Sequence, residues 1–218
     1  YDTLVSVDKL GQIMDLDLEH HEPNEKVIES TNEGLKFGME NVVFQPADAL
    51  YPILNGVSLT IDPGKKVVVT GQSGSGKSAM MALFAGLYEQ YQGNVLVNDL
   101  SLEYINLEKF RGMVGDFLEL QQIFHGTILE NICMGRSHEE GQLAEILELV
   151  GLKDYIYHAP LGLETQLQPE GKGLAKTIAF QIILARGFMG NPKALIMENV
   201  LNYVDPTIKA RMTPVSTP

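Results

Sequence analysis

A glycine-rich stretch of eight residues, GQSGSGKS, constrains the fold of this chain more than any other feature. It spans Gly71–Ser78 and satisfies the pattern G-x-x-x-x-G-K-[ST] in full. Glycines allow the backbone to curl so that successive N–H groups face a phosphate, and the N-terminus of a following helix adds a positive potential. The residues expected to contact a nucleotide are therefore Gly71, Gln72, Ser73, Gly74, Ser75, Gly76, Lys77 and Ser78.

The sequence on either side of this loop has the order that phosphate binding requires. A strand pattern, KKVVVT at 65–70, precedes it, and a helical pattern runs from Ser78 to Tyr88. In this arrangement Lys77 supplies a positive charge to the β- and γ-phosphate oxygens, and the Ser78 hydroxyl can coordinate Mg²⁺. The chain is thus predicted to be an α/β protein with a P-loop NTPase core that binds a nucleotide and Mg²⁺.

The remaining patterns predict strands at both ends of the chain around a helical insert. Short β-branched runs, VVF, VSLTI and GNVLVND, indicate strands, and Ala194–Met197 is typical of a buried strand. Residues 175–189 predict a helix. A further helix is predicted where Ser137 and Glu140 have the spacing of a capping box ahead of apolar residues at helical intervals, namely Leu143, Ile146, Leu147 and Val150. An α/β core with a helical subdomain follows from this order.

Composition excludes several classes of protein. At 218 residues the chain can form one sizeable α/β domain with room for a subdomain. The net charge of -12 argues against a general nucleic-acid binder, because no basic excess is present to replace phosphate counterions. The single cysteine, Cys133, excludes an internal disulfide. No apolar run is long enough to cross a bilayer, and the absence of an initial Met suggests a piece of a longer protein.

Four blocks of sequence follow one another in a specific order: ILNGVSLTIDPGKKVVVTGQSGSGKS, FRGMVGDFLELQQIFHGTILENICMG, APLGLETQLQPEGKGL and ILARGFMGNPKALIMENVLNYVD. In this order they resemble the Walker A segment, the Q-loop region, the approach to the signature helix, and the signature helix, Walker B strand and D-loop of an ABC transporter's nucleotide-binding domain, of the exporter type. The resemblance implies a RecA-like core sheet with an antiparallel β edge. It assigns the domain to 37–205, with a helical subdomain at about 120–178, a linker from a membrane domain at 1–36 and a truncated tail at 206–218.

The same resemblance implies which residues bind the metal ion and the adenine base of the nucleotide. Glu198 stands at the Walker B aspartate and Glu119 at the Q-loop glutamine, so Ser78, Glu198 and Glu119 are the expected metal ligands. Pro46 stands near the usual place of the aromatic residue that stacks on adenine, and Tyr51 is a possible substitute. The D-loop aspartate is retained as Asp205, whereas the chain ends before the H-loop histidine.

Two departures from the family pattern affect catalysis. The catalytic glutamate is replaced by Asn199, and an amide cannot accept a proton near neutral pH. Losing such a base typically costs about 10²–10⁴ in rate. The signature L-S-G-G-Q reads Leu174-Ala175-Lys176-Thr177-Ile178, which adds Cβ groups where glycine allows close approach to a partner's nucleotide. No catalytic residue is therefore assigned, and slow hydrolysis or none is expected.

The implied partners are a transmembrane domain in the same parent chain and a second nucleotide-binding domain, in a homo- or heterodimer, on the cytoplasmic face of a membrane. A nucleotide-gated regulatory or assembly module that binds ATP without driving transport is the alternative. A third interpretation, a P-loop kinase, requires a mobile lid that carries arginines. Arg136, Arg186 and Arg211 are scattered along the sequence, which disfavours it.

Overall fold

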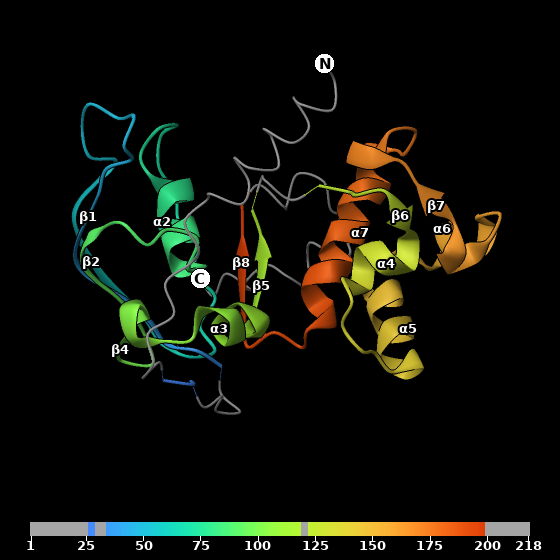
Figure 1. Ribbon diagram of the computed structural model, residues 1–218, viewed down its shortest axis with the longest axis horizontal. Coiled ribbons are helices and arrows are strands. Elements are labelled where there is room, and N and C mark those ends of the chain that lie inside the picture. Colours follow the sequence, from blue (N-terminus) through green and yellow to red (C-terminus); the bar gives the residue numbers. More distant parts are fainter. Residues whose placement is uncertain (1–25, 29–33, 119–121, 199–218) are drawn as a thin grey trace, which may run out of the picture.

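The computed structural model describes residues 26–28, 34–118 and 122–198. In Figure 1 they form a β-rich part on one side, a helical part on the other, and a pair of parallel strands between them. This arrangement confirms the predicted α/β class, with a helical subdomain and an antiparallel β edge. The predicted tail at 206–218 and most of the predicted linker at 1–36 lie outside the described residues.

Four antiparallel strands form the sheet of the β-rich part, in the order β2-β1-β3-β4. They are β1 (Phe37–Phe44), β2 (Leu54–Ile61), β3 (Gln92–Val97) and β4 (Leu100–Ser101). Apolar residues of this sheet pack against helices α2 (Lys77–Phe84) and α3 (Leu107–Met113), which cover it in Figure 1. Val42, Val95 and Val97 are completely buried in this core, as the alternation of a strand's side chains between two faces predicts.

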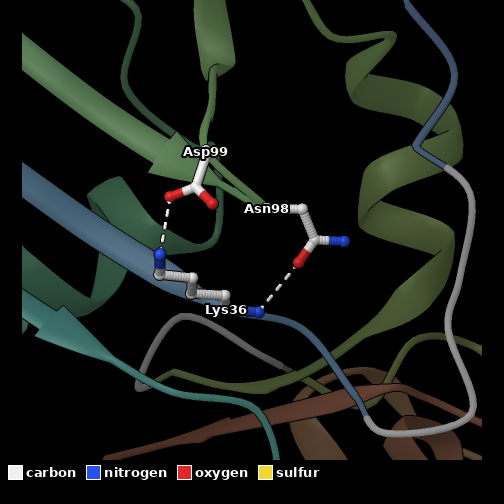
Figure 2. Close-up of polar contacts among 3 residues, drawn as sticks. All are labelled: Lys36, Asn98 and Asp99. Carbon is white, nitrogen blue, oxygen red and sulfur yellow. Dashed lines mark hydrogen bonds and ion pairs between the residues drawn. The ribbon is translucent and has the colours of Figure 1, made fainter.

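The tight turn between β3 and β4 is tied to the residue that precedes β1 (Figure 2). Asn98 and Asp99 have φ values of 49° and 63°, which the two central residues of such a hairpin turn require. The Lys36 ammonium donates to Asp99 Oδ1 at 2.7 Å, and the Lys36 backbone N–H donates to Asn98 Oδ1 at 2.9 Å. The bond to Asp99 raises the pKa of Lys36. These contacts fix the point at which the chain enters the sheet.

The parallel pair at the centre consists of β5 (Val114–Phe117) and β8 (Ala194–Met197), which confirms the strand predicted at the latter range. Because the strands are parallel and in register, their carboxyl ends lie at the same edge. Val114 packs into the core of the β-rich part and Phe117 into that of the helical part, so the pair joins the two cores. β8 is less buried than predicted, since 39% of Leu195 is exposed.

Helices α4 to α7 build the helical part, at the opposite end of the molecule from β1 and β2 (Figure 1). Its elements are β6 (Gly126–Thr127), α4 (Ile128–Cys133), α5 (Glu140–Leu149), α6 (Lys153–His158), β7 (Gln166–Leu167) and α7 (Lys176–Met189). The 3-10 turns are η1 (Leu102–Tyr104) in the β-rich part, and η2 (Gly162–Glu164) and η3 (Pro169–Gly171) here. The helix predicted at 175–189 is confirmed as α7, whose buried face crosses the core.

The strand predicted at 65–70 is absent, since these residues are not assigned to any strand. Within the described ranges, no other strand pairs with them. Val67 and Val68 are 54% and 65% exposed. A strand depends on hydrogen bonds to a neighbour, so β-branched residues alone do not form one.

The capping box predicted from Ser137 and Glu140 is also wrong. α5 begins at Glu140 itself, its N-cap residue is Glu139, and that end has no side-chain cap. Because the helix begins three residues after Ser137, the serine hydroxyl is not at the capping position. A capping box occurs instead at α4, where Thr127 Oγ1 accepts from the Glu130 N–H at 3.0 Å and the Glu130 carboxylate accepts from the Thr127 N–H at 2.7 Å.

Residues that precede β1 contribute to the β-rich core. The Lys26 N–H donates to Tyr104 O at 2.7 Å, and the Asn106 N–H donates to Lys26 O at 3.1 Å. Ile28 and Leu35 are buried in the same core as the sheet. Those residues of the predicted linker that the structure describes therefore pack on the domain. None of the described helices combines the length and the apolar composition needed to span a bilayer.

Candidate nucleotide-binding site

The glycine-rich loop Gly71–Ser78 leads directly into α2, whose N-cap residue is Gly76. Gly74 and Gly76 have φ values of 81° and 85°, a left-handed conformation that glycine adopts without steric cost. A Cβ atom on Gly76 would lie 2.6 Å from Leu54 Cδ2 and 3.0 Å from Ile53 O. The loop therefore packs closely against the start of β2, and at this position only glycine fits.

The ammonium group of Lys77 is turned back onto the loop that carries it. Lys77 Nζ donates to Gly71 O at 3.0 Å and to Gln72 O at 2.7 Å, and it lies 3.4 Å from Ser75 Oγ. An ammonium group has three donors, and here all three point at acceptors within the loop. The loop thus has a cation at its centre, at the position predicted for the phosphate-binding lysine.

The Ser78 hydroxyl donates a hydrogen bond to Glu198 Oε1, although the two residues are 120 positions apart in the sequence. Glu198 follows β8 directly, and its backbone N–H donates to Phe117 O at 3.1 Å. The pairing of β5 with β8 therefore places this carboxylate beside the first turn of α2. Two of the three residues predicted as metal ligands therefore lie next to each other, although they come from distant parts of the chain.

This pair of oxygen-bearing groups fits a hard divalent cation. Mg²⁺ is commonly held by one or two carboxylates together with water and the phosphates of a substrate. A serine hydroxyl and a glutamate carboxylate at one point match that donor set. Elsewhere among the described residues, no group of three or more His, Cys, Asp or Glu side chains could hold a metal ion. Metal binding at this point would therefore depend on phosphate oxygens as well as on Ser78 and Glu198.

The loop between β1 and β2 carries Tyr51, the residue predicted to stack on adenine. Its side chain is 79% exposed. Ile53, two positions later, contacts Gly76 of the glycine-rich loop, so the two loops are neighbours. Pro46 lies half-buried in a turn in which its carbonyl accepts from the Ala49 N–H at 3.0 Å. Tyr51 is thus largely exposed, in a loop next to the phosphate-binding loop.

The altered signature segment lies at the start of α7. Ala175 is the N-cap residue and supplies no side-chain cap, and Lys176 and Thr177 are exposed in the first turn. Ile178 is half-buried and packs against the core of the helical part. Of the four substituted positions, Ala175, Lys176 and Thr177 are therefore exposed, whereas Ile178 contributes to packing.

Several predicted residues lie outside the described part of the chain, namely Glu119, Asn199 and Asp205. The arginines that a kinase lid would require can be placed in part. Arg186 is buried within α7, and Arg136 Nη1 donates to the Arg186 carbonyl at 3.2 Å. A buried arginine cannot belong to a mobile lid, which further disfavours the kinase interpretation.

Two features of this region were not predicted from the sequence. The contact of Ile53 and Leu54 with Gly76 depends on the tertiary fold and has no local signal. Arg186 is buried and donates to carbonyls outside its own helix. Burial lowers the pKa of Arg186, the nearby Arg136 lowers it further, and Asp116 opposes both. A lone arginine within the apolar run IILARGF was a signal that could have identified this buried group.

Comparison with known proteins identifies a family whose model covers the glycine-rich loop and Glu198. The family model described as "ABC transporter" matches residues 54–202. The colicin V secretion/processing ATP-binding protein CvaB of Escherichia coli is 31% identical over 155 residues, which are 71% of this chain and 22% of that protein. A putative export ATP-binding/permease protein of Rickettsia bellii is 31% identical over 167 residues, which are 76% of this chain and 29% of that protein.

Among solved structures, a bacterial Atm1-family ABC exporter with ATP bound has the same fold, with a TM-score of 0.82 at 23% identity. The match covers 96% of this chain and 37% of the exporter chain. The chain thus spans less than a third of the curated relatives named above and little more than a third of this exporter. Because the family model matches more than half of the residues, and its range includes both the glycine-rich loop and Glu198, the chain belongs to the ABC transporter family.

Proposed function

We propose that this chain is the ATP-binding domain of an ABC exporter-like membrane transporter, and that it holds Mg-ATP with impaired or absent hydrolysis. The hydrogen bond from Ser78 to Glu198 is the observation that carries this proposal. It unites the end of the glycine-rich loop with the end of an apolar parallel strand. In P-loop proteins the metal that accompanies the nucleotide is bound between these two elements.

The geometry of the loop supports the proposed binding of the phosphates. Backbone N–H groups of 71–78 and the N-terminus of α2 would bind the phosphates, and Lys77 would exchange its bonds to loop carbonyls for bonds to phosphate oxygens. Ser78 and Glu198 would hold Mg²⁺, with Glu119 as a further ligand at the Q-loop position. Bound magnesium would neutralise phosphate charge. Tyr51 would stack on the base.

Hydrolysis would be slow because the residue after Glu198 is Asn199. An amide can orient a water molecule by hydrogen bonding, but it cannot remove a proton from it. The signature segment is altered as well. A nucleotide bound to the P-loop of a partner domain would therefore face the sequence LAKTI, residues 174–178, in place of L-S-G-G-Q. A dimer that includes this chain would therefore have no site with the full set of catalytic groups.

Metal dependence is expected to be strong. The negative charges of Glu198 and Glu119 would repel the phosphates of free ATP, and the positive charge of bound Mg²⁺ would offset that repulsion. Binding of metal-free ATP should therefore be much weaker than binding of Mg-ATP. Equal affinities with and without Mg²⁺ would contradict this part of the proposal.

The proposed domain covers 37–205, with a helical subdomain at about 120–178. Residues 1–36 would connect it to a transmembrane domain of the same parent chain, and 206–218 would form a short tail. A second nucleotide-binding domain would be its partner, at the cytoplasmic face of the membrane. The relatives named as secretion and export proteins support this assignment.

The test follows bound nucleotide and released phosphate in one sample of the full protein with excess Mg-ATP. Lys77→Ala is the control, because it removes the charge at the centre of the loop. We expect ATP to be retained with no phosphate release above that of the control. Turnover at a typical enzyme rate that depends on Lys77 would show that another group supplies the missing base, and it would overturn the proposal of impaired hydrolysis.

A further inference from the structure

Two hollows adjoin each other beside the start of β5. Each has a volume of about 340 Å³, and the residues that line both of them are Gly112, Val114, Asp116 and Arg136. The end of α7 also lines the first hollow, and α3 with the turn after α2 also lines the second. Because β5 and β8 are parallel, their amino ends lie at the opposite edge from Glu198, which follows β8. The hollows are therefore separate from the candidate nucleotide-binding site.

The lining of these hollows is positively charged, although the chain as a whole is acidic. Its charged members are Arg111, Arg136, Arg186, Glu108 and Asp116. Three guanidinium groups and two carboxylates give the lining a formal charge of +1, against -12 for the whole chain. A small anion that the rest of the surface repels would therefore be attracted to this place.

Arg136 is the residue of this lining that is best placed to bind an anion. Its side chain is exposed, and Nη1 donates to the Arg186 carbonyl at 3.2 Å. A guanidinium group has several further N–H donors in the same plane. Within residues 26–28, 34–118 and 122–198, no second acceptor bonds to this side chain. Its other donors can therefore bind a ligand that enters the hollows from solvent.

Arg186 adds a second positive charge beside the first hollow. Only 8% of this residue is exposed. The charge of Arg136 lowers the pKa of Arg186, in addition to the larger effect of burial, and Asp116 raises it. The three groups are thus close enough for their charges to interact. Two cations held near each other repel, and an anion bound between them would offset that repulsion.

Two glycines leave open the space that a ligand would occupy. Gly112 lies within α3, and Gly190 is the C-cap residue of α7 with a φ of -77°, so neither position has a backbone conformation that requires glycine. A Cβ atom on Gly112 would meet nothing within 4 Å, and one on Gly190 would lie 3.7 Å from Arg136 Nη1. Glycine within a helix lowers its stability relative to alanine. The small size of these residues therefore opens the hollows and does not serve the fold.

We propose that these hollows form a second ligand-binding site, for a small molecule that carries a phosphate or carboxylate group. Arg136 would bind this oxyanion through its planar fork, whose geometry matches both groups, and Arg186 would attract it from the interior. Glu108 and Asp116 would repel a ligand with several negative charges, so a singly or doubly charged oxyanion fits the lining and a polyphosphate does not. The inference does not depend on the function proposed for the glycine-rich loop.

The test titrates the full chain with inorganic phosphate and, separately, with malonate, and follows backbone amide chemical shifts by NMR. Sodium chloride keeps the ionic strength constant. The titrations are repeated in Lys77→Ala, because the glycine-rich loop could also bind an anion. We expect saturable shifts at the amides of Gly112 and Gly190 that Lys77→Ala retains. Shifts with phosphate alone identify a phosphate ligand, shifts with malonate alone identify a carboxylate ligand, and shifts with both show that either group is accepted.

Arg136→Gln should weaken binding of the anion by about tenfold or more, because hydrogen bonds to a charged group contribute at least that much to affinity. The variant should fold, since this side chain is exposed. Lys109→Gln is the matched control. It removes the same charge from an exposed position on α3 that lines neither hollow, so the affinity should be nearly unchanged.

A second variant fills the space and leaves the charges in place. Gly112→Leu adds a side chain where nothing lies within 4 Å, so we expect it to fold and to lose the shifts at Gly190. Gly141→Leu, at an equally open position on α5, should bind as the parent chain does. The inference is overturned if neither anion gives these shifts, or if folded Arg136→Gln or Gly112→Leu binds as tightly as the parent chain. Loss of the shifts in Lys77→Ala would also overturn it, because the anion would then belong to the glycine-rich loop.

Discussion

The aromatic ring of Phe117 fills the space that a side chain at position 187 would need, because a Cβ atom on Gly187 would lie 2.3 Å from Phe117 Cζ. Gly187 lies on α7 and Phe117 at the end of β5. Close packing of the helical part on the central strands therefore depends on a glycine in a helix. The same strand end carries the backbone bond from Glu198, so this contact also supports the candidate site.

Gly187→Ala should destabilise the protein. The Phe117 ring is almost completely buried and cannot move without disturbing its neighbours. Overpacking of this kind typically costs about 1–3 kcal/mol, which urea unfolding would measure. Gly141→Ala is the matched control, since it adds the same methyl group to α5 where nothing lies within 4 Å. It should be neutral or stabilising by up to about 1 kcal/mol. Equal effects of the two substitutions would contradict the packing described here.

Gly76→Ala should be more damaging than Gly74→Ala. Both glycines have a positive φ, so both variants incur the cost of a left-handed residue, about 1–2 kcal/mol. Only Gly76 has an additional clash, with Leu54 and the carbonyl of Ile53. Thermal unfolding of the two variants should therefore differ, with the Gly76 variant less stable. Similar melting temperatures would show that the loop does not pack on β2 as described.

Glu198→Gln should reduce the effect of Mg²⁺ on ATP affinity. The substitution keeps the size of the side chain and removes its charge, which weakens metal binding and relieves repulsion of free ATP. A hydrogen bond to a charged group contributes about 1.5–3 kcal/mol, so the ratio of affinities with and without Mg²⁺ should fall by about tenfold or more. Titration calorimetry with and without a chelator measures both values. If the ratio of affinities with and without Mg²⁺ is unchanged, Glu198 does not contribute to metal binding.

Tyr51→Ala should weaken ATP binding and leave the binding of Mg-triphosphate, which lacks a base, unchanged. Stacking of a base on an aromatic ring typically contributes about 1–3 kcal/mol, and Tyr51→Phe should preserve it. Tyr157→Ala is a suitable control, because this tyrosine is similarly exposed but lies on α6. If Tyr51→Ala binds ATP as tightly as the parent chain does, another residue contacts the base.

Tyr91 should make the protein less stable at high pH. Burial, together with the charge of Glu103, raises the pKa of Tyr91 from 10.0 to about 12. Between these values the unfolded chain releases the phenolic proton and the folded protein retains it, so the free energy of unfolding falls as pH rises. Below pH 10 this contribution is fully present. Tyr91→Phe should remove this part of the loss of stability at high pH, which denaturant midpoints measured between pH 10 and pH 12 would show. If the midpoints of the variant fall with pH as steeply as those of the parent chain, the raised pKa of Tyr91 is contradicted.

Elements with strong local signals could be predicted from the sequence. The glycine-rich loop, α7 and β8 were located to within one or two residues, because glycine spacing and apolar periodicity act over short distances. The strand at 65–70 was predicted on the same kind of signal and proved wrong. Its valines favour a strand, but pairing depends on a neighbour that local sequence does not reveal.

The polar network of the helical part could not have been predicted in this way. Arg186 is bonded to Asn131 and to Gln122, which are 55 and 64 positions away in the sequence. Contacts at such separations arise from the packing of α7 on α4, and no periodicity encodes them. Ser78 and Glu198 are farther apart in the sequence, by 120 positions. Both were nevertheless assigned to the metal site, because the family resemblance indicated their roles and local sequence patterns did not.

The loop carbonyls that receive the Lys77 ammonium group have a consequence for the heat of ligand binding. Phosphate binding would then be an exchange, in which anionic oxygens replace two neutral carbonyls around an ammonium group that the loop already binds. The enthalpy of binding is then the difference between two sets of hydrogen bonds, rather than the full value of the new set. Phosphate binding would therefore break the hydrogen bonds from Lys77 to the loop carbonyls and leave those carbonyls to find other partners.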